Sequence, residues 1–145
     1  MTTVFRSAYP ASIESASTLQ ELVGNLMQSF LPLAKRNKNH FVNDIPDDLY
    51  IDTDRDLVAT VLSGMLSTII KHAKESSICM SAKIYGNVVL VHIKDYNNFN
   101  YFSIENNLQK LQPLAEKVGG SVGVTSQRHN VATFAFSFMN IHLAA

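Results

Sequence analysis

Few side chains in this sequence have the types and spacing that catalysis or metal binding requires. The chain has one cysteine, and its histidines show no close ligand spacing: His40, His72, His92, His129 and His142. A tetrahedral zinc site is therefore not expected. No serine lies in a nucleophile-elbow motif, and of the six glycines only Gly119 and Gly120 are adjacent. The sequence therefore predicts neither a hydrolase triad nor a glycine-rich phosphate loop.

Four polar residues lie near the ends of predicted elements. Thr68, Lys71 and His72 lie near the end of a predicted helix, and Asp95 ends a predicted strand. Each has an ordinary structural role as well. A lone threonine hydroxyl is a weak ligand for a divalent cation, positive side chains stabilise a helix C-terminus, and strand-end aspartates commonly cap turns.

Apolar residues recur at helical spacing in three segments, which predicts three helices over residues 18–33, 52–74 and 103–118. Thr18 and Glu21 have the spacing of a capping box, and Pro32 is expected to kink the first helix or end a segment of it. We expect Ser103 to cap the third helix and Gly119-Gly120 to end it.

Extended segments are predicted at residues 4–8, 40–42, 49–51, 78–85, 88–94, 121–126 and 131–139. Gly86-Asn87 is a two-residue signal that closes a hairpin. In the last segment Phe134, Phe136 and Phe138 alternate with small residues, so one face of that strand is aromatic. Helices segregated from a mixed, mainly antiparallel sheet predict an α+β, two-layer sandwich with three helices on one face.

The composition predicts one folded domain over residues 1–145. Hydrophobic residues make up 46% of the chain and charged residues 17%, which excludes an intrinsically disordered protein. The formal net charge of zero provides no global field for nucleic acid or for an anionic membrane, and it permits either a monomer or a homodimer. We interpret Cys79 as a buried small hydrophobe in a reducing compartment, which favours a cytoplasmic location.

The run Leu66-Ser67-Thr68-Ile69-Ile70-Lys71-His72-Ala73 resembles a helix of the histidine-kinase-type ATPase domain, the GHKL or Bergerat fold. The resemblance covers residues 18–139 in the family's order. It includes the segments 31–34, 88–95, 114–120 and 133–136.

The resemblance implies a vestigial nucleotide site at Asp95, Lys71, His72 and Thr68. Asp95 matches the aspartate that accepts the adenine amino group, whereas Lys71 and His72 match residues that approach phosphate and nucleotide. Gly64 and Thr68 occupy the positions of two asparagines, one of which holds magnesium.

Three departures from the family pattern predict impaired nucleotide binding. Asn97 and Phe99 replace two glycines after Asp95, fewer than ten residues stand where the family carries a long ATP lid, and Glu105 and Asn107 occupy a second glycine motif. A carboxylate at the triphosphate position repels that ligand.

The resemblance therefore implies a degenerate, stand-alone module of two-component signal transduction. We expect it to bind a signalling protein partner, with no cofactor and no kinase or ATPase activity of its own. The alternative is a divergent ATP-binding kinase domain that uses Lys71, His72 and Asp95. A third reading, a small-molecule pocket in the vacated space, competes with our expectation that Phe99, Tyr101 and Phe102 fill that space.

Overall fold

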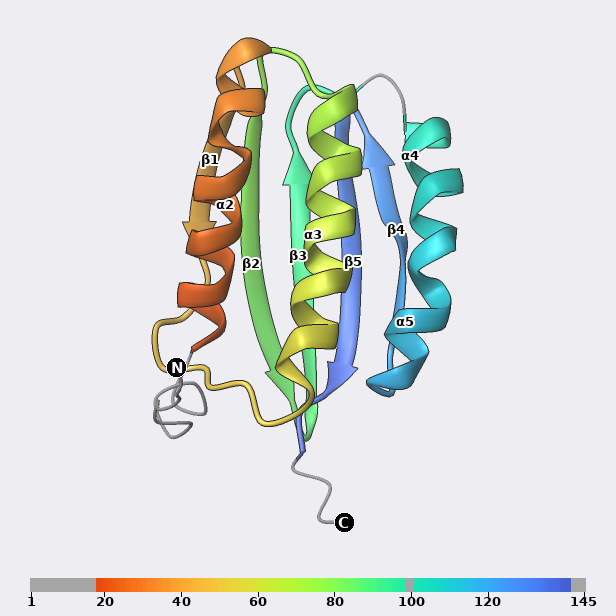
Figure 1. Ribbon diagram of the computed structural model, residues 1–145. Coiled ribbons are helices and arrows are strands. Elements are labelled where there is room, and N and C mark those ends of the chain that lie inside the picture. Colours follow the sequence, from red (N-terminus) through yellow and green to blue (C-terminus); the bar gives the residue numbers. More distant parts are fainter. Residues whose placement is uncertain (1–17, 99–100, 142–145) are drawn as a thin grey trace.

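The computed structural model describes residues 18–98 and 101–141, with the side chain of Tyr101 excepted (Figure 1). The helices and strands follow the order α2 (Leu19–Arg36), β1 (His40–Asp44), α3 (Arg55–His72), β2 (Ser77–Tyr85), β3 (Val88–Asp95), α4 (Tyr101–Leu108), the 3₁₀ turn η1 (Gln109–Leu111), α5 (Gln112–Lys117), β4 (Ser121–Arg128) and β5 (Val131–Met139). The predicted strand at residues 4–8 lies outside the described residues.

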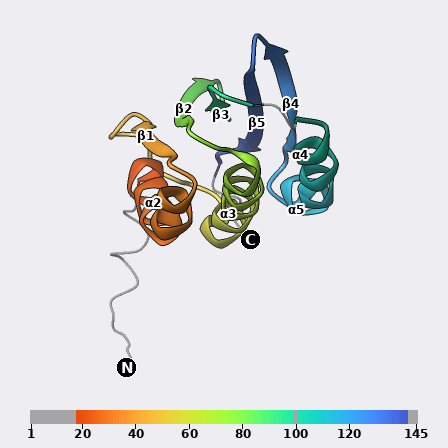
Figure 2. The ribbon, with the colours of Figure 1, turned by 90° about the horizontal axis from the view of Figure 1, so that it is seen from above.

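The described chain forms two layers. The five strands make one sheet in the order β1-β2-β3-β5-β4, in which β1 and β2 are parallel and the other neighbours are antiparallel. All the helices of the described residues cover the same face of this sheet, as the view from above shows (Figure 2). The predicted α+β sandwich with a mixed, mainly antiparallel sheet is confirmed.

Local sequence signals explain how the first two long helices begin. Thr18 Oγ1 accepts a hydrogen bond from Glu21 N at 3.1 Å, and Glu21 Oε1 accepts one from Thr18 N at 3.1 Å, which completes the predicted capping box. Asp54 caps α3 by accepting from Leu57 N at 3.1 Å. Pro32 does not end α2, which continues to Arg36.

The core lies between the sheet and the helices. Phe134, Phe136 and Phe138 are fully buried on the covered face of β5, as the alternation predicts. The β2–β3 hairpin turns at Gly86, whose φ of 61° falls in the left-handed region that glycine adopts freely. Hydrophobic alternation and turn chemistry therefore set the register of the central strands.

Two predicted elements differ in the structure. Residues 49–51 form no strand; Tyr50 makes only an isolated bridge with Thr18. The third helix begins at Tyr101, so Ser103 lies inside it rather than at its cap, and it is divided into α4, η1 and α5. Pro113, near the start of α5, has no N–H to donate and its ring crowds the preceding turn, which favours this division.

Cys79 lies on the face of the sheet that none of the described helices covers, and this corrects its predicted burial. It is only partly buried, and desolvation together with Asp44 raises the pKa of its thiol, with Lys94 opposing. His92 is half-buried on the same face, where desolvation lowers its pKa, with further contributions from Lys94 and Lys83. Within the described residues, no helix has both the length and the apolar character needed to cross a bilayer.

Candidate functional site

Asp95 ends β3 on the helix-covered side of the sheet and has no exposed surface. Its Oδ1 accepts hydrogen bonds from the Ser76 hydroxyl and from Asn97 N, the latter at 3.1 Å. Its Oδ2 accepts from Asn98 Nδ2 at 2.8 Å. The Asp95 carboxylate, which the family resemblance assigns to the adenine contact, therefore already accepts three hydrogen bonds from within the chain.

A second buried amide extends this network. Asn39 Oδ1 accepts from Ser76 N at 3.1 Å, and Asn39 Nδ2 donates to the Ala73 carbonyl at 3.1 Å. Asn39, Ser76 and Asn98 are at most 4% exposed. Buried polar groups of this kind are costly unless paired, so the network fixes the loop after α3 against the start of β1 and the end of β3.

Gly64, Thr68 and His72 form one stripe along α3, four residues apart. Thr68 Oγ1 donates to the Gly64 carbonyl at 2.9 Å, and His72 Nδ1 lies 2.9 Å from the Thr68 carbonyl. Because a carbonyl only accepts, Nδ1 carries the proton in this contact. Thr68 and His72 thus each bond to their own helix.

The space in front of Gly64 is occupied by Leu111. A Cβ built on Gly64 would lie 2.7 Å from Leu111 Cδ2 and 3.0 Å from Cδ1. Gly64 therefore permits η1 to pack directly on α3, at the position where the family resemblance places an asparagine. The sequence alone does not reveal this contact.

We predict that Gly64→Asn destabilises the protein by about 1–3 kcal/mol, because the new side chain overpacks this contact. Urea unfolding measures the change. Ser63→Asn is the matched control on the same helix and should change stability by less than about 0.5 kcal/mol. Adding Leu111→Ala should recover part of the loss from Gly64→Asn; an unchanged loss would contradict the packing explanation.

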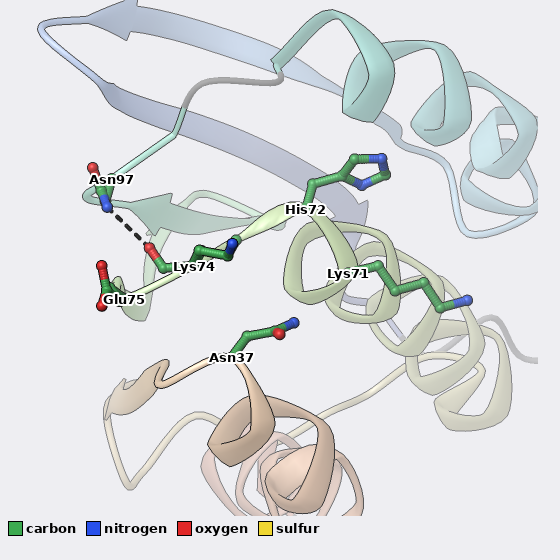
Figure 3. A pocket seen from close by; sticks show the side chains of 7 residues that line it. Asn37, Lys71, His72, Lys74, Glu75 and Asn97 are labelled. Atoms are coloured by element: carbon green, nitrogen blue, oxygen red, sulfur yellow. Dashed lines mark hydrogen bonds between the residues drawn. The ribbon is translucent and has the colours of Figure 1, made fainter.

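Lys71 and His72 line an open hollow of about 480 Å³ at the C-terminal end of α3 (Figure 3). Asn37 and Asn97 also line it, and Asn97 Nδ2 donates to the Lys74 carbonyl at 2.9 Å. Lys71 and His72 project from different sides of α3 in this view. The hollow is lined by neither Asp95 nor Thr68. The structure therefore divides the four predicted site residues among a buried network, a helix stripe and a surface hollow.

The connection from Asp95 to α4 is short, and α4 begins at Tyr101. Phe102 is 67% exposed, so the prediction that it folds inward to fill the site is wrong for this ring. Phe102 lies in the first turn of α4, whereas Ile104 and Leu108 of this helix are buried. Phe99 and the Tyr101 side chain, which belong to the same prediction, lie outside the described residues.

Glu105 and Asn107 belong to α4, where Asn107 Nδ2 donates to the Ser103 carbonyl at 3.0 Å. The segment that matches the family's second glycine motif is thus regular helix. No cluster of histidine, cysteine, aspartate or glutamate suited to a metal ion occurs within residues 18–98 and 101–141.

The fold is that of a histidine-kinase catalytic domain. The chain matches the Acinetobacter baumannii histidine kinase AdeS with a TM-score of 0.72 and 12% identity, over 85% of this chain and 65% of that one. It matches the catalytic domain of histidine kinase ThkA with a TM-score of 0.70 and 15% identity, over 88% of this chain and 97% of that one.

A third match is ThkA in complex with the response regulator protein TrrA, with a TM-score of 0.70 and 17% identity, over 86% of this chain and 41% of that one. The chain thus spans about two-thirds of the AdeS chain and less than half of this ThkA chain. No family model and no curated protein matches the sequence.

Proposed function

We propose that this chain is a histidine-kinase-type module that does not hold Mg-ATP and that acts by binding a signalling protein. The observation that carries the proposal is the Asp95 carboxylate, which is fully buried and accepts from Ser76, Asn97 and Asn98. An adenine amino group would have to displace these internal donors, and each displaced buried donor costs about 1–3 kcal/mol.

The α3 stripe supports the same proposal. Magnesium bound by ATP needs hard oxygen ligands, and Gly64 supplies none from its side chain. Leu111 occupies the neighbouring space, and the Thr68 hydroxyl donates to the helix backbone. The bridging cation would therefore lack its usual protein ligand.

The protein-binding half of the proposal rests on the fold and on one precedent. ThkA, which has this fold, is found in complex with the response regulator TrrA. We therefore propose that the chain has a stand-alone regulatory role in two-component signalling, in which its surfaces contact other proteins. We propose a cytoplasmic location, which the single cysteine of the sequence favours.

One observation favours the alternative of a divergent ATP-binding kinase domain. Lys71 and His72 line the same open hollow, and a cationic hollow of this size can accommodate phosphates. In that case the adenine contact at Asp95 would require the buried network to open.

Isothermal titration of the full chain with Mg-ATP tests the proposal. We expect a dissociation constant for Mg-ATP of about 1 mM or weaker, which corresponds to a binding free energy of about −4 kcal/mol or less favourable. At protein concentrations of about 100 μM, such binding gives no resolved binding curve. The ThkA catalytic domain serves as the positive control. Micromolar binding that Lys71→Ala abolishes would overturn the proposal in favour of the alternative.

A further inference from the structure

The neutral chain carries opposite charges at its two ends. Helices α2 and α3 run in the same direction, from the lower to the upper end of the molecule (Figure 1). Five exposed cations gather where these helices end, and we call this surface the cationic end: Lys35, Arg36, Lys38, Lys71 and Lys74. Six exposed carboxylates gather between the end of β1 and the start of α3: Asp44, Asp47, Asp48, Asp52, Asp54 and Asp56. The zero net charge conceals this separation.

The cationic end is hollowed. The hollow beside Lys71 and Lys74 shares Asn37, Lys74 and Glu75 with a second one that Arg36 and Lys38 line. A third hollow is lined by Leu31 and Phe41 together with Lys35 and Lys38. Glu75 is the one acidic side chain among these lining residues. The surface therefore combines positive charge with an apolar recess.

Helix stability explains only part of this arrangement. Lys35, Arg36 and Lys71 lie in last helical turns, where positive charge is favourable. Lys38 and Lys74 lie beyond the helices, and Lys38 has a φ of 60°. This left-handed conformation costs a residue other than glycine about 1 kcal/mol, because its Cβ crowds the backbone, whereas glycine adopts it freely. A lysine at this position is therefore not the choice that stability alone would favour.

We infer that the cationic end is a docking surface for an acidic segment of a partner protein, with an apolar side chain of that segment in the recess beside Leu31 and Phe41. The inference rests on the proposed function, because it names the surface through which the module binds its partner. Complementary charge accelerates encounter and selects the partner, and the recess provides an apolar anchor.

A protein segment fits this surface better than nucleic acid does. Proteins that bind single strands stack bases on exposed aromatic rings. In the described part of the chain no exposed phenylalanine or tyrosine lines these hollows, and Phe41 is half-buried. The cations are also confined to the ends of two helices rather than arranged in a long stripe.

Fluorescence anisotropy of the full chain with a labelled glutamate-rich peptide that carries one central leucine tests the inference. We expect binding that weakens as salt rises. Lys35→Glu with Lys38→Glu should weaken it about tenfold or more. The matched control is Lys110→Glu with Lys117→Glu, which changes the net charge equally on exposed positions of η1 and α5. It should change affinity less than about twofold.

Lys38→Gly provides a second, independent readout. It should leave thermal stability unchanged or higher, since glycine relieves the left-handed strain, while it weakens peptide binding about two- to fourfold. A structural role for Lys38 would instead lower stability without changing the peptide affinity.

Three outcomes would overturn the inference: no peptide binding at low salt, equal losses in the two charge-reversed pairs, or tighter binding of an oligothymidylate of equal charge than of the peptide. These readouts are independent of Mg-ATP titration. ATP binding with a charge-sensitive peptide site would reject only the nucleotide part of the proposed function. If neither Mg-ATP nor the peptide binds, only the docking surface is rejected.

Discussion

Asp95→Ala is expected to lower the free energy of unfolding by about 3–5 kcal/mol, because the substitution leaves several buried donors without acceptors. Ser76, Asn97 and Asn98 all donate to this carboxylate, and the side chain is fully buried. Urea unfolding monitored by circular dichroism, with an unchanged slope, measures the loss. In a working nucleotide site the same aspartate would face the ligand, and its removal would abolish binding with little effect on folding.

Asp95→Asn separates the hydrogen-bond pattern from the loss of side-chain volume. It keeps an acceptor for Ser76 and Asn97 but places an NH₂ group opposite Asn98 Nδ2, so we expect a smaller loss of about 1–3 kcal/mol. Adding Asn98→Asp supplies a new acceptor and should recover part of that loss. Strictly additive losses in the double variant would show that residues 95 and 98 are not coupled.

Gly120→Ala is expected to cost about 3 kcal/mol, because a Cβ at this position would overlap the carbonyl oxygen of Ser137 and lie 3.0 Å from the Cα of Phe138. Both are backbone atoms of β5, so no side-chain rotation relieves the clash. The expected result is a fall of several degrees in the melting temperature, measured by calorimetry.

Gly123→Ala is the matched control for this variant. Gly123 lies in β4, three residues further along the chain, and a Cβ there would meet no atom within 4 Å. We expect a change within about 0.5 kcal/mol, because alanine adds no clash. Equal effects at residues 120 and 123 would show that the close approach to β5 does not determine the cost.

The features that sequence analysis predicted are those that depend on near neighbours. The Thr18–Glu21 capping box, the turn at Gly86 and the aromatic face of β5 each follow from residues a few positions apart. The family resemblance supplied the order of the elements, and the fold is confirmed by solved structures at 12–17% identity.

The features that it missed join distant parts of the chain. Ser76 reaches Asp95 across the β2–β3 hairpin, and Leu111 packs against Gly64 from a different helix. Neither pair leaves a pattern in one sequence, since a serine before a strand and a glycine in a helix have many uses. The cationic end was missed for another reason: a net charge is a sum, and it carries no information on where helices end.

The cross-links around the cationic end affect how a partner would associate. Asn97 Nδ2 donates to the Lys74 carbonyl at 2.9 Å, and Asn98 N donates to the Asn130 carbonyl at 2.7 Å, so the loops after α3, β3 and β4 are held together. Because these hydrogen bonds order the backbone of the cationic end before a partner binds, the protein loses little conformational entropy when the complex forms. Recognition should then proceed close to rigid-body docking on the module's side, with the ordering penalty borne by the partner's segment.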